Sequence, residues 1–213
     1  MKLVFKNTSI GPLLTLHNAA TSLPLTLHLQ SLAPQAMYLA AYRRMYRLRH
    51  FVNRSESSIA NYRNVLRRRF TKTNFNIRRI KVLGIDQPLT HDEMAGRLAN
   101  TIAFIFNSTC NISDTVPDVQ FYEDLKSASK IRIETSVVAT ILLMENEKPP
   151  ALKYDYSYKW VDETRRFYGE LEKHSASKKE LNRLYNTGKA NFAGFLQYET
   201  TVMGLNETQG LLL

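Results

Sequence analysis

The sequence YRRMYRLRHFVNRSESSIANYRNVLRRRFTKTNFNIRRIK, residues 42–81, decides the fold of this chain. It holds thirteen lysines and arginines against one acid, Glu56, and so carries a net charge of +12. The whole chain carries +10, so the residues outside this basic segment sum to −2. The positive charge is therefore concentrated in one place, and such a local field favours a polyanionic or acidic partner.

The basic segment has the apolar spacing of two helices. Tyr42 and Met45 continue an apolar stripe that predicts a helix over about 35–53, with Arg43 and Arg47 on the opposite face. Tyr62, Leu66 and Phe70 then form the stripe of a second helix, whose flanks carry further arginines. Because only a few residues link the two helices, we expect an antiparallel hairpin with an apolar interior.

The rest of the chain also favours helices, since it has only 8 glycines and 7 prolines in 213 residues. Thr90 and Glu93 have the spacing of a capping box that opens another helix. The sequence predicts an all-α small helical bundle, as one domain over 35–213, behind an irregular N-terminal arm, 1–34. Its expected segments are the basic hairpin 35–81, helices over about 90–110, 117–146 and 160–186, and a C-terminal segment 188–213.

The N-terminal arm contains no acid, and none occurs before Glu56. An acid-free segment rich in leucine and hydroxyl residues resembles a mitochondrial targeting segment, although it lacks the arginines usual there. Leucines alternate with other residues over 23–29, which favours a short strand. The sequence therefore leaves two interpretations of the arm, a segment that targets the protein to mitochondria, with the matrix as the expected location, or a disordered or extended arm. No run of 18 apolar residues is present, so no transmembrane segment is expected.

Catalysis requires converging groups of suitable pKa, and the sequence offers no recognisable set. The five histidines have no ligand spacing, and the motifs of zinc sites, nucleophile elbows and phosphate-binding loops are missing. A lone Cys110 without an identifiable base is typical of a small buried side chain. We expect a non-enzyme with no catalytic residue, no metal site and no cofactor.

Part of the hairpin resembles the LYR family of small mitochondrial helical adaptors. The resemblance rests on Ala41-Tyr42-Arg43, then Arg47 and Phe51, and on Tyr62-Arg63 with the cluster 67–70. Ala41 replaces the leucine of the motif. The resemblance implies an acidic partner, mitochondrial acyl carrier protein, whose acyl-phosphopantetheine enters between the helices. It implies that Arg43, Arg47, Arg67 and Arg68 bind the partner, and that Tyr42, Phe51, Tyr62 and Phe70 shape the apolar interior. Together with the helical pattern, we expect these partner-binding residues: Arg43, Arg44, Arg47, Arg63, Arg67 and Arg68. We expect this hairpin interior: Tyr42, Met45, Phe51, Tyr62, Leu66 and Phe70.

A second resemblance covers more of the chain. The hairpin residues and the C-terminal sequence Leu205-Asn206-Glu207-Thr208-Gln209-Gly210 are similar to a fungal family known as increased recombination centers protein nineteen, or required for respiratory growth protein four. We expect the C-terminal motif to be the most specific part, because nothing about folding alone would require it. The resemblance implies roles in respiratory growth, mitochondrial genome maintenance and sporulation, without known catalytic activity.

Three interpretations of the basic segment remain. It is an adaptor surface for an acidic protein, a nucleic-acid-binding surface, or a solvated helical face. Arginines beside tyrosines suit phosphate contacts and base stacking, which keeps mitochondrial DNA or RNA as the alternative partner. However, Tyr42 and Tyr62 fall on predicted buried stripes, whereas a stacking platform would need them exposed. The sequence therefore favours the adaptor.

Overall fold

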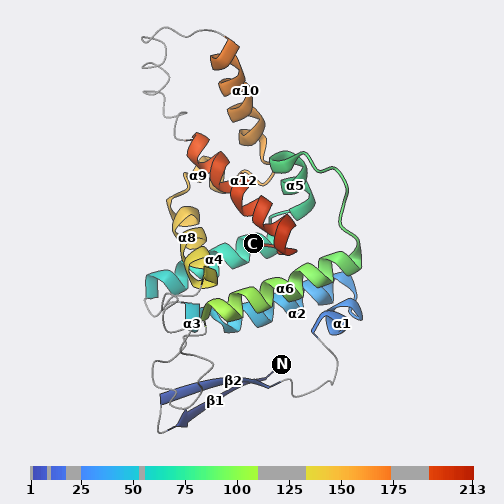
Figure 1. Ribbon diagram of the computed structural model, residues 1–213, viewed down its shortest axis with the longest axis vertical. Coiled ribbons are helices and arrows are strands. Elements are labelled where there is room, and N and C mark those ends of the chain that lie inside the picture. Colours follow the sequence, from blue (N-terminus) through green and yellow to red (C-terminus); the bar gives the residue numbers. More distant parts are fainter. Residues whose placement is uncertain (1, 9–10, 18–24, 53–55, 110–132, 174–191) are drawn as a thin grey trace, which may run out of the picture.

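The computed structural model describes residues 2–8, 11–17, 25–52, 56–109, 133–173 and 192–213. The described residues form an all-α bundle, as predicted, preceded by one pair of strands (Figure 1). The elements are β1 (Lys2–Thr8), β2 (Gly11–His17), α1 (Leu25–Gln30), α2 (Pro34–Arg47), α3 (Arg49–Val52), α4 (Glu56–Thr71), α5 (Phe75–Leu83), α6 (His91–Thr109), α8 (Ile133–Glu147), α9 (Pro150–Lys153), α10 (Lys159–Lys173) and α12 (Phe192–Gln209).

The N-terminal arm is more regular than the sequence suggests. β1 and β2 pair antiparallel, with Lys2 opposite His17 and Thr8 opposite Gly11. The strand expected over 23–29 is wrong, because Leu25–Gln30 forms α1. Alternation over so few residues does not separate the two structures. Packing against α6 favours the helix, since it buries Leu29 completely.

The basic segment forms a helical hairpin and one further helix. α2 begins at Pro34, which suits the first helical position. α3 and then α4 follow α2. α5 begins as a separate helix because the Asn74 side chain caps it, accepting hydrogen bonds from the backbone N–H groups of Asn76 (3.0 Å) and Ile77 (3.2 Å). Contacts of Tyr62 with Met45, and of Phe70 with Tyr38 and Tyr42, agree with antiparallel packing of α2 and α4.

The capping box predicted for α6 is confirmed. The Thr90 N–H donates to Glu93 Oε2 (2.8 Å), and the Glu93 N–H donates to Thr90 Oγ1 (3.3 Å). The helix expected over 117–146 is described as α8, Ile133–Glu147, and its earlier part lies outside the described residues. The helix expected over 160–186 is described as α10, Lys159–Lys173, and residues 174–186 likewise lie outside them.

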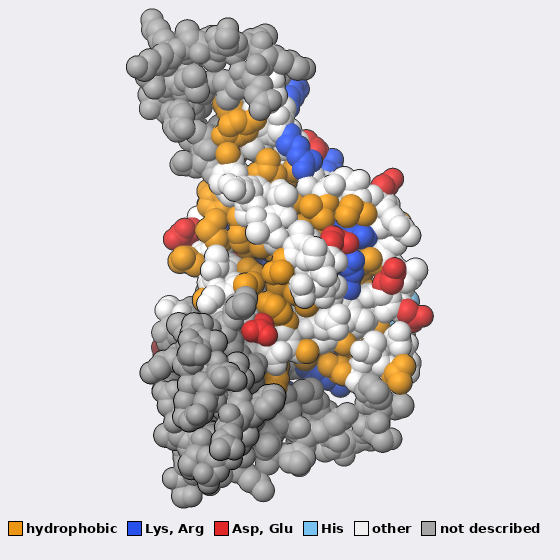
Figure 2. Space-filling view, viewed as in Figure 1, with side chains coloured by type: hydrophobic (Ala, Val, Ile, Leu, Met, Phe, Trp, Pro, Cys, Tyr) orange, Lys and Arg blue, Asp and Glu red, His pale blue; other side chains and the backbone are white. Residues whose placement is uncertain are grey.

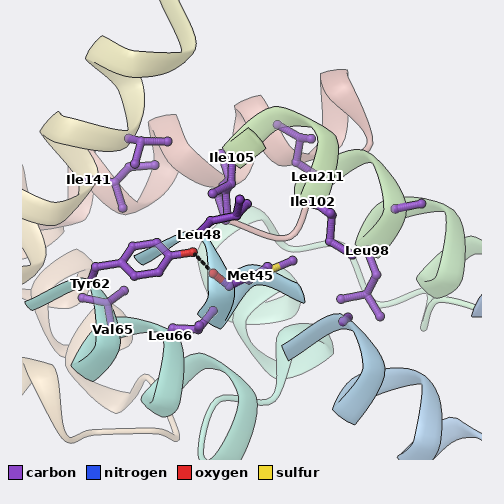
Figure 3. Close-up of a cluster of buried hydrophobic side chains, with 14 of the residues drawn as sticks. Met45, Leu48, Tyr62, Val65, Leu66, Leu98, Ile102, Ile105, Ile141 and Leu211 are labelled. Atoms are coloured by element: carbon purple, nitrogen blue, oxygen red, sulfur yellow. Dashed lines mark hydrogen bonds between the residues drawn. The ribbon is translucent and has the colours of Figure 1, made fainter. Parts of the chain in front are cut away.

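α12 lies between two hydrophobic cores. The larger core joins α1, α2, α4, α6 and α8, and α12 contributes Tyr198 and Val202 to it (Figures 1 and 3). The smaller core joins α5, α9 and α10, including Trp160 and Val161, and receives Met203 from the other side of α12. Because α12 is buried on two sides, its polar residues at those positions are enclosed as well.

Candidate functional site

Four arginines of the basic segment are exposed on the helical hairpin. Arg43 and Arg47 lie four residues apart on α2, and Arg63 and Arg67 lie four apart on α4. Residues at this spacing share one side of a helix. α2 packs against α4, so both pairs belong to one helical unit. We call these four side chains the exposed arginines.

Two other arginines predicted to bind a partner are placed differently. Arg44 is half-buried: its Nη1 donates to the Ala40 carbonyl (3.1 Å), and burial, with the nearby Arg47, lowers its pKa. Arg68 turns inward, where its Nη2 donates to Glu145 Oε2 (2.9 Å) and its Nη1 to the Lys153 carbonyl (3.2 Å). Only part of the predicted surface therefore faces solvent.

The residues predicted for the hairpin interior are buried to different degrees. Met45, Tyr62 and Leu66 are buried, whereas Tyr42, Phe51 and Phe70 are half-buried. The Tyr62 hydroxyl donates to the Met45 carbonyl (2.9 Å), as Figure 3 shows. Burial raises the pKa of Tyr62, so this phenol stays neutral and links α4 to α2.

The later part of the basic segment meets acids inside the molecule. Glu145 of α8 accepts from Arg68 (2.9 Å) and Arg69 (2.8 Å), and Glu199 of α12 pairs with Arg78 through Nε (2.8 Å). Lys148 also pairs with Glu199 and lies 3.7 Å from Glu145. We call this set the buried charge network: Arg68, Arg69, Arg78, Lys148, Glu145 and Glu199.

The buried charge network stays ionised because its members neutralise one another. Burial alone would raise the pKa of Glu145, but Arg69 and Lys148 hold it below its ordinary value. Burial acts on Glu199 in the same way, and Arg78 and Lys148 hold its pKa far below the ordinary range. The Glu145 carboxylate likewise raises the pKa of Arg69 against the opposing effect of burial. Removing either acid would leave buried cations without a counter-charge.

The end of the chain forms a second polar cluster, which we call the C-terminal clasp: Arg79, Arg97, Asn206, Glu207, Gly210 and Leu213. Glu207 accepts from both Arg79 (2.9 Å) and Arg97 (2.8 Å). The fully buried Asn206 side chain accepts from the Leu213 N–H (2.9 Å) and donates to its carbonyl (3.1 Å). Gly210 ends α12 with a φ of +59°, where a side chain would be strained.

A family model described as increased recombination centres protein 19 matches residues 14–213 of this chain. The chain belongs to this family. Its name connects the family with recombination and genome maintenance. No curated protein and no solved structure matches the chain.

The C-terminal motif, residues 205–210, is part of the similarity to this family, and the structure gives it a role in folding that the sequence did not predict. The sequence suggested that folding does not require Leu205 to Gly210. Instead, Asn206, Glu207 and Gly210 each have a structural task in the C-terminal clasp, as their hydrogen bonds and backbone angle show. Figure 2 shows acidic and basic side chains close together on the face near α5, α10 and α12.

Three cavities adjoin the buried charge network, and the smallest, of about 20 Å³, is lined by Arg68, Glu145 and Lys148. A small apolar cavity of about 60 Å³ lies between α2, α4, α6 and α8, and its lining includes Tyr62 and Ile105. A larger cavity of about 360 Å³ lies where the end of α4 meets α5, α6 and the chain end. Arg69 and Phe70 line the two larger cavities. Among the described residues, no group of three acidic, histidine or cysteine side chains is arranged to hold a metal ion.

Sequence reasoning missed the acids of the buried charge network. Glu145 and Glu199 lie within apolar stretches of α8 and α12, with Leu142 and Val202 close by in the sequence. An acid on the apolar side of a helix requires a buried partner. That signal could have linked these acids to the surplus of arginines at residues 68–81, although it could not have paired them individually.

Proposed function

We propose that this chain is a non-enzymatic adaptor in which the exposed arginines bind an acidic protein. The single observation that supports this is the division of the basic segment. Arg68, Arg69, Arg78, Arg79 and Lys81 meet acids of this chain, whereas Arg43, Arg63 and Arg67 make no ion pair with any described residue. The second group is free for an external partner.

The proposed partner is mitochondrial acyl carrier protein, with its acyl-phosphopantetheine, as the LYR resemblance implies. The hairpin supports the proposal in two ways. It carries its arginines on two helices that pack together, and it has a small apolar cavity of about 60 Å³ behind them. An acidic protein surface would complement the exposed arginines, and such complementarity mainly accelerates association and selects the partner.

The proposed setting is the mitochondrial matrix, where the adaptor would serve respiratory growth, maintenance of the mitochondrial genome and sporulation. The acid-free N-terminal segment supports this location. None of the described helices is long and apolar enough to cross a membrane. A genome-maintenance role is compatible with an indirect action, because loss of respiratory assembly or of mitochondrial translation also destabilises the organelle genome.

The test is co-purification of the full chain with mitochondrial acyl carrier protein. We expect a complex with the natural chain and at least a tenfold loss of affinity when Arg43→Glu and Arg67→Glu are combined, because two attractive charges become repulsive. Lys159→Glu is the control for a single charge reversal, since Lys159 is exposed on α10 and is not one of the hairpin residues. The proposal would be contradicted if the natural chain formed no complex, or if the double arginine variant and the Lys159→Glu control bound the carrier protein equally well.

Nucleic-acid binding is the alternative outcome of the same experiment. Base stacking needs accessible rings, but Tyr62 is 4% exposed and Tyr42 stacks on Tyr46 with ring centroids 5.7 Å apart. These placements support the adaptor over a nucleic-acid surface. If instead DNA or RNA co-purifies, with an affinity that falls steeply as salt rises, the nucleic-acid function replaces the proposed one.

A further inference from the structure

The larger cavity, of about 360 Å³, has the features of a small-molecule site. Its volume lies within the range of about 300–1,000 Å³ that is typical of ligand pockets. It is formed by the junction of α4 and α5, by α6 and by the chain end, and Tyr38 of α2 borders it. Elements far apart in sequence therefore converge on one space, as in most binding sites.

The charged side chains that line this cavity are all cations. They are Arg69, Lys72 and Arg78, and no acid of the described residues lines it. Arg69 and Arg78 belong to the buried charge network, which has four cations and two carboxylates. A carboxylate at Leu213, where the sequence stops, would lower this excess from two to one. An excess of buried positive charge favours an anion beside it.

Arg78 retains unused hydrogen-bonding capacity. Its side chain is fully buried, Nε donates to Glu199 Oε2 (2.8 Å) and Nη1 donates to the Leu213 carbonyl (2.5 Å). Its Nη2 lies 2.7 Å from the same Glu199 oxygen, yet it makes no hydrogen bond of acceptable geometry. The distance establishes the ion pair, and the angle leaves Nη2 without a well-aligned acceptor. A buried donor of this kind costs free energy until an acceptor reaches it.

The remaining lining is apolar and aromatic. Phe70 contacts the Tyr38 ring edge to face, with centroids 6.3 Å apart, and Phe75, Met94 and Leu98 complete the apolar lining. A ligand ring could extend this aromatic cluster, because edge-to-face contacts are favourable. We propose that this cavity binds a small carboxylate with an aromatic or apolar body, its head near Lys72 and Arg69 and its body against Tyr38, Phe70 and Leu98. The inference does not depend on the adaptor function.

The test uses 4-phenylbutanoate as the probe and 4-phenyl-1-butanol as its neutral counterpart, titrated calorimetrically into the full chain. We expect a Kd on the order of 1 mM or below for the carboxylate, given the binding energy available per ligand atom. The alcohol should bind about tenfold more weakly, because it cannot make charge-assisted hydrogen bonds with the cations. No detectable heat with the carboxylate, or equal affinities for the two probes, would overturn the proposal.

A pair of variants locates the binding site. Lys72→Glu reverses an exposed charge at the cavity without touching the buried charge network, and should weaken carboxylate binding about fivefold. Lys159→Glu makes the same change on α10 and should leave the affinity unchanged. A thermal denaturation curve for each variant verifies the fold. Equal affinities in the two variants would show that the carboxylate binds elsewhere, and would overturn the assignment to this cavity.

Discussion

Arg67 and Arg68 are neighbours in sequence, yet they belong to two different regions of the molecule. Arg67 is exposed on α4 with the other exposed arginines, whereas Arg68 pairs with Glu145 in the buried charge network. The same residue type thus remains available to the proposed partner in the first region and contributes to cohesion in the second. The difference shows that a basic segment cannot be interpreted from its net charge alone, because tertiary structure decides which charges remain available.

The largest expected effect is on the buried side of this comparison. Glu199→Ala leaves Arg78 and Lys148 buried without their counter-charge, so we expect the free energy of unfolding to fall by about 3–5 kcal/mol. Urea denaturation of the variant and the natural chain measures this change. Glu163→Ala, at an exposed position of α10, is the control and should have little effect. If both variants lose equal stability, the buried charge network is not the source of cohesion.

A second prediction concerns pH. Glu145, Glu199 and Glu207 have pKa values below the ordinary range in the folded chain, so the folded state binds fewer protons than the unfolded state. Their stabilisation is fully present above the unfolded carboxyl pKa of about 4.3 and is lost as the pH falls through the folded values. Urea midpoints should therefore hold steady from pH 7 to about pH 5 and decrease below it. A midpoint that stays constant down to pH 3 would contradict this.

A smaller loss is expected in the C-terminal clasp. Glu207→Gln keeps the shape of the side chain but removes the charge shared by Arg79 and Arg97, so stability should fall by about 2 kcal/mol. Asp162→Asn is the matched control, because its pair with Lys81 is exposed and should contribute about 0–1 kcal/mol. Urea denaturation ranks the two variants. The reverse order would show that burial does not decide the strength of these pairs.

The smallest effect on stability is expected from the exposed arginines. Arg43→Glu and Arg67→Glu should each change the free energy of unfolding by less than about 0.5 kcal/mol, since neither side chain is buried or paired with a described residue. The same urea denaturation measures it. A loss of several kcal/mol would erase the distinction between the two regions, and would also weaken the proposed docking role.

Local features of the fold could be predicted from the sequence. The Thr90–Glu93 capping box located the start of α6, and the spacing of Tyr62 and Leu66 identified the buried side of α4. Both signals arise within one or two helical turns, where sequence spacing sets geometry. The strand predicted from the alternating leucines over 23–29 is wrong, because the structure there depends on burial of Leu29 against α6.

The candidate site was less predictable, because its decisive contacts are distant in sequence. The spacing of Arg43 and Arg47 correctly placed both on an exposed side of α2. It could not separate Arg67 from Arg68, since the acid that turns Arg68 inward lies 77 residues away. The larger cavity was also invisible, because α4, α5, α6 and the chain end enclose it only after folding.

The pairing of Arg78 with Glu199 has a consequence for the order of synthesis. The two residues are 121 positions apart, and only one acid, Glu56, precedes Asp86. At a translation rate of about 5–20 residues per second, Arg78 is added to the chain about 6–24 s before Glu199. During that interval the nascent chain is strongly cationic and its cores cannot close. Arg78 therefore stays without its Glu199 counter-charge until α12 has been synthesised.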